Sequence, residues 1–216
     1  MKVFIETLGL EYNPLTTQIE SHDWITRLNN EFALSGTIAT DFCRDFWQYI
    51  SVGYLKQTVK SGEVGSSTMP HKVNPIDFEN AEANFGIANA LLRHLSEKLP
   101  ISRLQRDLSD SSALRSLSTA YGHYYLALQS LAKGLSKVYA DSEQMLKDLD
   151  NEWALLTEAV QTIMRKNGIP DAYNQMKDLS RGKPLDKETL HEFIQGLDID
   201  DKDKQALLDL TPQTYI

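Results

Sequence analysis

Three long stretches of this chain repeat apolar residues every three or four positions, and that pattern constrains the fold more than any other feature. The first spans about residues 17–57, the second follows residue 76 and stops at Lys98-Leu99-Pro100, and the third runs from the N-cap residues 109–111 to about residue 138. Such spacing places the apolar side chains on one face of a helix. The sequence therefore predicts an all-α fold based on a long-helix bundle.

Beyond residue 140 the periodic stretches are shorter. Amphipathic helices are expected at about residues 153–165, 172–179, 187–195 and 201–208, separated by turns rich in glycine and proline. No alternating pattern indicates a strand. The sequence thus predicts a long-helix region over residues 1–140, with an irregular loop at 61–76, and a small helical C-terminal domain over residues 141–216.

The first long helix has few potential neighbours within the chain, since only residues 1–15 precede it. Its apolar stripe could bind a partner, but stripes of this kind usually form a core, and that is the reading we favour. A bundle of this length then needs helices from elsewhere. We expect an oligomer, a fragment of a longer protein, or both.

The loop between the first two helices concentrates reactive groups in the segment GSSTMPHKVNP, residues 65–75. Pro70 and Pro75 lack backbone donors and keep the segment irregular. A Ser-Ser-Thr stretch alone would suggest a polar surface turn, but the eleven residues together favour a catalytic loop. A serine hydroxyl acts as a base only where positive charge or backbone donors lower its pKa, and Lys72 could supply that charge or hold a substrate carboxylate.

A second cluster, RLQRDLSDSSALR at residues 103–115, combines arginines and hydroxyls with a predicted helix start. Unpaired backbone donors and guanidinium groups suit a phosphate, while the alternative is an ordinary N-cap beside solvated arginines. Gln18, His22 and Asp23 form a weaker polar group near the start of the first long helix.

Composition excludes several classes of protein. The net charge is −8, and the 16 acidic and 9 basic residues from Asp141 onward carry most of it, which argues against binding to nucleic acid or an anionic membrane. No apolar run would cross a bilayer and no secretory signal opens the chain, so we expect a cytoplasmic protein. Cys43 is expected to be a buried thiol, and the histidine spacing predicts no metal site.

The loop GSSTMPHKVNP resembles the signature loop of the fumarase/aspartase superfamily of lyases. Together with YNPLTTQIESHD (residues 12–23), MPHKVNPIDFENAE (residues 69–82) and the 103–115 cluster, it makes most of the chain similar to the bacterial adenylosuccinate lyase family. This resemblance implies a homotetramer whose long helices form a twenty-helix core, with each active site assembled from three subunits. It implies no cofactor.

The resemblance also implies the reaction and its residues. Fumarate is eliminated from adenylosuccinate, giving AMP, and from the succinylated aminoimidazole carboxamide ribotide SAICAR, giving AICAR. By motif position Ser66 would be the catalytic base, assisted by the backbone amides of Ser67 and Met69. The implied substrate-binding residues, which hold the succinyl carboxylates, the phosphate and the rest of the purine nucleotide, are Gln18, Lys72, Asn74, Asn80, Arg106, Ser111, Ser112 and Arg115.

One part of the family's pattern has no counterpart in these residues. The general-acid histidine lies in the family's N-terminal domain, and none of the five histidines present matches it. We therefore expect a C-terminal portion that is inactive alone. Two alternatives stay open: a related lyase acting on argininosuccinate, aspartate or malate, and a non-catalytic helical scaffold.

Overall fold

A computed structural model describes residues 1–58, 74–182 and 184–215 of the chain. The chain divides into two compact units, Met1–Ala140 and Asp141–Ile216, each with its own core. Helices dominate both units, which confirms the all-α prediction. Within the described residues no helix combines the length and apolar character needed to span a membrane.

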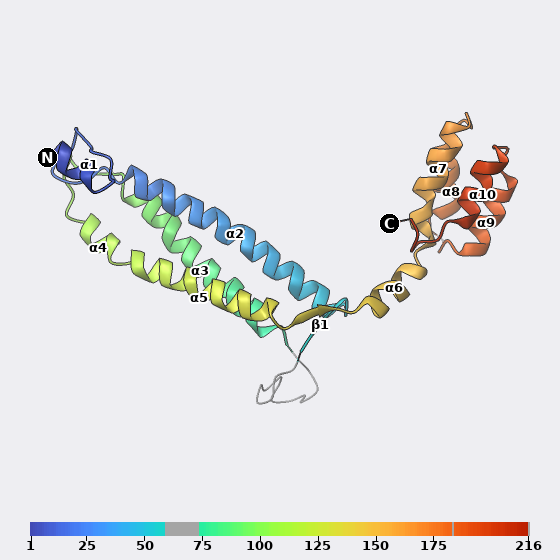
Figure 1. The fold of residues 1–216 in the computed structure, drawn as a ribbon, viewed down its shortest axis with the longest axis horizontal. Helices are drawn as coiled ribbons and strands as arrows, with labels where there is room; N and C mark the ends of the chain where they lie inside the picture. Colours follow the sequence, from blue (N-terminus) through green and yellow to red (C-terminus); the bar gives the residue numbers. More distant parts are fainter. Residues whose placement is uncertain (59–73, 183, 216) are drawn as a thin grey trace. The chain divides into compact units, whose positions relative to one another are not determined.

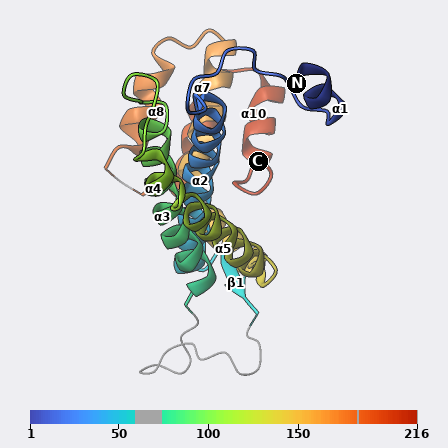
Figure 2. The same cartoon turned by 90° about the vertical axis from the view of Figure 1, so that its left-hand side faces the viewer.

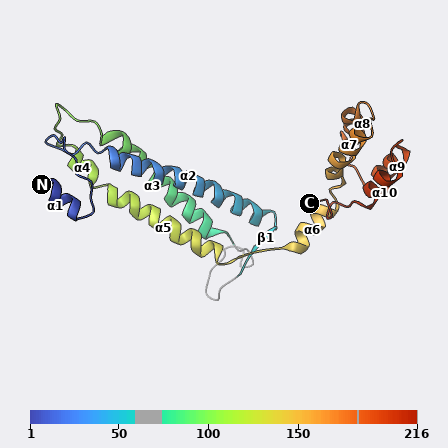
Figure 3. The same cartoon turned by 45° about the horizontal axis from the view of Figure 1, so that its top comes forward.

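Three long helices form the first unit: α2 (Asp23–Ser51), α3 (Ile76–Lys98) and α5 (Leu117–Leu135). They lie side by side in two views, with α3 packed against both others (Figures 1 and 3). Phe78, Phe85 and Leu92 of α3 are fully buried between them. Aromatic rings complete the core, where Phe32 of α2 packs edge-on against Tyr124 of α5, with centroids 5.0 Å apart.

Polar groups cross this core at two points. The Tyr121 hydroxyl donates to Asn29 Oδ1 at 2.7 Å, and Asn29 is fully buried. Farther along, Gly36 of α2 allows Asn89 of α3 to approach so closely that a Cβ at position 36 would lie 2.4 Å from Asn89 Oδ1. The α2–α3 spacing therefore depends on a residue with no side chain.

Two helices are shorter in the structure than the sequence predicts. The stretch predicted at 17–57 forms α2 only over Asp23–Ser51, because side-chain hydrogen bonds and a left-handed His22 (φ 59°) hold the chain before it. Its last residues form β1 (Leu55–Gln57), which pairs antiparallel with β2 (Val138–Ala140), so the third predicted helix also ends early. That helix is broken as well, into α4 (Asp110–Leu114) and α5.

The second unit contains α6 (Ser142–Asp150), the 3-10 turn η1 (Trp153–Leu156), α7 (Thr157–Lys166), α8 (Ala172–Ser180), α9 (Lys187–Gly196) and α10 (Asp201–Asp209). The four helices predicted from the sequence correspond to η1 with α7, α8, α9 and α10. Their core includes Val160, Met164, Leu190 and Ile194, all at most 1% exposed. Neither α6 nor the short α1 (Lys2–Thr7) of the first unit was predicted, since neither contributes a fully buried residue.

Candidate functional site

The predicted loop residues fall into two groups. Ser66, Ser67, Met69 and Lys72 lie outside the described residues. Asn74 is half-buried just before α3, and Asn80 is exposed in the second turn of that helix. The side chain of Asn84 donates to Asn80 Oδ1 at 2.6 Å and so orients the Asn80 amide.

Lys137 anchors the chain on both sides of the undescribed segment 59–73. Its backbone carbonyl accepts a hydrogen bond from the Thr58 amide at 2.8 Å, and its ammonium donates to Asp77 Oδ2 at 2.7 Å. Burial of the Asp77 carboxyl opposes ionisation, but hydrogen bonds and charge from Lys137 and Lys133 hold its pKa below the usual range. The start of α3 is thereby tied to the end of α5.

The 103–115 cluster lies at the other end of α3 and begins with a tight turn. Arg103 and Arg106 pair through two backbone hydrogen bonds of 2.8 and 3.1 Å. Between them Leu104 and Gln105 both adopt left-handed conformations, with φ of 49° and 65°. Such a turn normally uses glycine or asparagine, and strained non-glycine residues are typical of functional sites.

Asp107 holds this turn against the bundle. Its carboxylate accepts from Lys98 Nζ at 2.7 Å, from Arg103 Nη1 at 3.0 Å and from the Ser109 amide at 2.9 Å. These contacts, led by the hydrogen bond from Lys98, hold the Asp107 pKa well below its usual range. The side chain is only 2% exposed, so Asp107 organises the cluster from beneath.

His22 links the segment containing Gln18 to this cluster. Its imidazole lies between two carboxylates, with Nδ1 3.0 Å from Glu20 Oε2 and Nε2 3.4 Å from Asp110 Oδ2. Asp110 in turn accepts from the Ser111 amide at 2.6 Å. The structure therefore brings the stretch that carries Gln18 to the start of α4, although Gln18 itself is exposed.

The predicted phosphate-binding residues lie in this short stretch of the chain. Arg106, Ser111, Ser112 and Arg115 are all exposed within ten residues of chain, and an open hollow of about 500 Å³ lies beside Arg103 and Arg106. Within the described part of the chain, neither Arg106 nor Arg115 forms an ion pair. Two guanidinium groups are thus available to an anion.

One copy of the chain does not bring Asn74 and Asn80 together with the 103–115 cluster. Asn74 and Asn80 lie at the start of α3, while Asp107 contacts Lys98 at its end. The helix has 23 residues and is about 34 Å long. Figure 1 shows the same separation, with α4 and β1 at opposite ends of the long helices, and Figure 2 views these helices from the side on which α4 lies. A site that uses both groups requires more than one chain.

Other candidate chemical groups are less prominent. Cys43 is buried, as predicted, and burial together with the Glu82 carboxylate raises the pKa of its thiol to about 11. The described residues contain no group of three or more His, Cys, Asp or Glu side chains arranged to hold a metal ion.

Comparison with known proteins shows the same family over nearly the whole chain. The family described as adenylosuccinate lyase C-terminal matches residues 102–216, and a family described as lyase matches residues 2–88. Adenylosuccinate lyase of Escherichia coli strain K12 is 49% identical over 213 residues, which cover 99% of this chain and 47% of the relative. That of Vibrio cholerae is 50% identical over 211 residues, covering 98% of this chain and 46% of the relative.

A solved structure agrees in fold. The crystal structure of 3-carboxy-cis,cis-muconate lactonizing enzyme from Pseudomonas putida superimposes with a TM-score of 0.72 at 22% identity, over 98% of this chain and 48% of that one. This chain spans about half the length of the relatives it matches. With a family match over residues 102–216, the chain belongs to the adenylosuccinate lyase family.

Proposed function

We propose that this chain is part of a cytoplasmic adenylosuccinate lyase, which eliminates fumarate from adenylosuccinate to give AMP and from SAICAR to give AICAR. The observation that carries the proposal is the 103–115 cluster. Its arginines Arg106 and Arg115, which form no ion pair with any described carboxylate, lie close in sequence to the exposed Ser111 and Ser112. A nucleotide phosphate supplies the anion that such a cluster needs. Relatives named adenylosuccinate lyase support the same reading.

The proposed chemistry is an elimination without a cofactor. Ser66, as an alkoxide, removes the proton beside a succinyl carboxylate. The electron pair left on that carbon forms the double bond of fumarate while the neighbouring carbon–nitrogen bond breaks. Lys72 and Asn74 stabilise the negative charge that develops on the carboxylates. The departing nitrogen takes a proton from a general acid, a role that we assign to none of the described residues.

The proposed site lies between copies of the chain, as a homotetramer would provide. Two observations support this assembly. Asn74 and Asn80 are separated from the 103–115 cluster of the same protomer by the length of α3. In addition, α2 exposes large apolar side chains, including Trp24, Leu34 and Ile38 at 58%, 56% and 63%. Exposed apolar surface of this extent is typical of protein–protein interfaces.

Mixing of two variants of the whole protein tests the proposal. Ser66→Ala, in the predicted catalytic loop, should lower kcat for fumarate release by about 100- to 10,000-fold with a smaller change in KM. Arg106→Ala, at the phosphate end, should mainly raise KM. When the two preparations are dissociated and reassembled together, fumarate release at a substrate concentration below the KM of Arg106→Ala should exceed that of either preparation alone, because some sites then combine an intact Ser66 with an intact Arg106.

The matched control mixes Arg106→Ala with Arg115→Ala, two lesions at the same end, where no site regains both arginines. Recovery in this control as strong as in the first mixture would contradict assembly of the site from opposite ends. Unchanged turnover in Ser66→Ala would contradict its role as the base. If both arginine variants kept full affinity for the nucleotide, the substrate would have to be a different one.

A further inference from the structure

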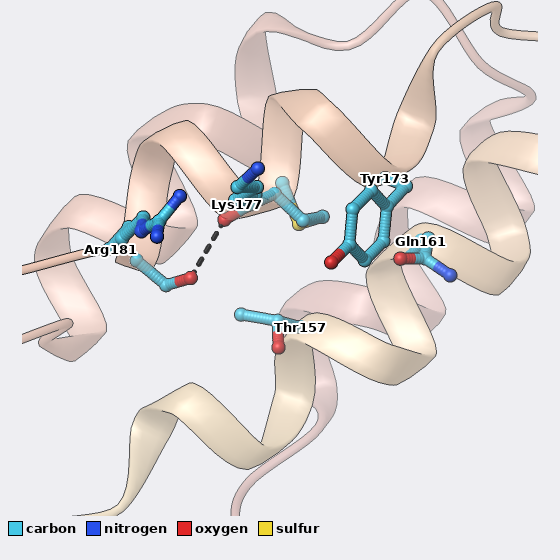
Figure 4. Close-up of a pocket in the computed structure, with 7 residues that line it drawn as sticks. Thr157, Gln161, Tyr173, Lys177 and Arg181 are labelled. Carbon is cyan, nitrogen blue, oxygen red and sulfur yellow. Dashed lines mark hydrogen bonds between the residues drawn. The ribbon is translucent and has the colours of Figure 1, made fainter.

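The second unit contains a hollow that has no part in the proposed elimination. It has a volume of about 510 Å³ and opens between α7 and α8, within the size range of small-ligand sites. Figure 4 shows that the lining comes from two helices, with Thr157 and Gln161 on α7, Tyr173 and Lys177 on α8, and Arg181 directly after α8. Met176 and Ser180 complete the lining, which contains no acidic residue.

The charge of this lining contrasts with that of the unit around it. From Asp141 onward the chain has 16 acidic and 9 basic residues, yet neither Lys177 nor Arg181 forms an ion pair with any described carboxylate. Lys177 lies in the last turn of α8, and Arg181 follows the helix in an extended conformation. Cations in the last turn of a helix are favoured by its dipole, which does not account for placing two of them together over one hollow.

Most polar side chains that line the hollow have no hydrogen-bond acceptor among the described residues. The hydroxyls of Thr157 and Ser180 already donate to the carbonyls of Ala154 and Met176, at 2.7 and 2.8 Å. By contrast, the side chains of Gln161, Tyr173, Lys177 and Arg181 make no hydrogen bond within the described part of the chain. Four unused donors, two of them cationic, therefore line one hollow, which suits an oxygen-rich anion.

We propose that this hollow binds a phosphate monoester that carries a planar ring. Lys177 and Arg181 bind the phosphate, which supplies the negative charge that neither cation finds among the described carboxylates. The Tyr173 ring, 57% exposed, offers a face to the planar group, and the Gln161 amide hydrogen-bonds its edge. The site uses no residue of the 103–115 cluster, so a test of ligand binding here does not depend on whether the proposed elimination is correct.

The test is an NMR titration of the 216-residue chain carrying Arg106→Ala, which weakens phosphate binding in the first unit. Three probes separate the contributions: phenyl phosphate has both groups, inorganic phosphate lacks the ring, and phenol lacks the charge. Phenyl phosphate should shift the amide signals of α7 and α8 at the lowest concentration, inorganic phosphate should need more, and phenol should leave them unchanged.

Substitution of the cations then assigns the site. The double variant Lys177→Gln, Arg181→Gln should weaken phenyl phosphate binding at least about tenfold. Tyr173→Leu should remove the preference for phenyl phosphate over inorganic phosphate. Arg165→Gln, an exposed cation of α7 that does not line the hollow, is the matched control and should bind normally. Equal losses in the control, or shifts scattered over both units, would overturn the proposal.

Discussion

At the scale of single residues, the Asp107 carboxylate has the most concentrated set of contacts near the proposed phosphate site. Asp107→Asn should loosen the turn at 103–106, because a neutral amide pairs poorly with both Lys98 and Arg103. We expect a lower urea midpoint and weaker nucleotide binding. The exposed Asp178→Asn is the control and should behave as the parent chain.

The pH dependence of this effect follows from the lowered pKa of Asp107. A carboxyl with a depressed pKa contributes stability above its unfolded pKa, about 3.9, and loses that contribution as the pH falls toward the folded value. The difference in urea midpoint between the parent and Asp107→Asn should therefore be constant from pH 7 to about pH 5 and shrink below about pH 4. A difference that instead grew at low pH would contradict this account.

What the sequence could predict at this scale depended on distance along the chain. Arg106, Ser111 and Arg115 could be grouped because they share one short segment. The roles of His22 and Lys137 could not, since their partners Asp110 and Asp77 are 88 and 60 residues away. Asp107 was within the predicted cluster, but only the fold shows that it faces Lys98 rather than solvent.

At the scale of elements, the close approach of α2 and α3 at Gly36 gives a paired prediction. Alanine is about 1 kcal/mol better than glycine within a helix, so Gly86→Ala, where nothing lies within 4 Å of the added Cβ, should stabilise the chain by up to that amount. Gly36→Ala should instead destabilise it by about 1–3 kcal/mol, because the new methyl displaces buried Asn89. Thermal unfolding of both variants measures the contrast, and two shifts of the same sign would contradict it.

Helix ends were predicted accurately only where neighbouring residues in the sequence determine them. The ends of α3 were predictable because Asp77 and Glu79 lie in its first turn and Pro100 lies two residues beyond its end at Lys98. The end of α2 was not, since β1 exists only through pairing with Val138–Ala140, about 80 residues later. The break between α4 and α5 falls among helix-compatible residues, where the Ser116 amide bonds Ala113 O and tightens the turn.

At the scale of the whole molecule, two separate cores predict that a defect in one unit stays there. Leu190→Ala removes a fully buried side chain from a core drawn entirely from the second unit and should cost that unit about 2–5 kcal/mol. Amide hydrogen exchange should accelerate in α7 to α10 and stay unchanged in α3. Leu155→Ala, 43% exposed in the same unit, is the control. Equal acceleration in α3 would contradict independent cores.

The placement of Asn74 and the 103–115 cluster at opposite ends of α3 also has a genetic consequence. If each site takes its loop residues from one chain and its 103–115 cluster from another, a chain defective in both inactivates sites that it shares with normal chains. In a cell making normal and doubly defective chains in equal amounts, only about a quarter of the sites would have two intact contributors. Such an allele would be partly dominant, whereas alleles defective at one end each would compensate for one another.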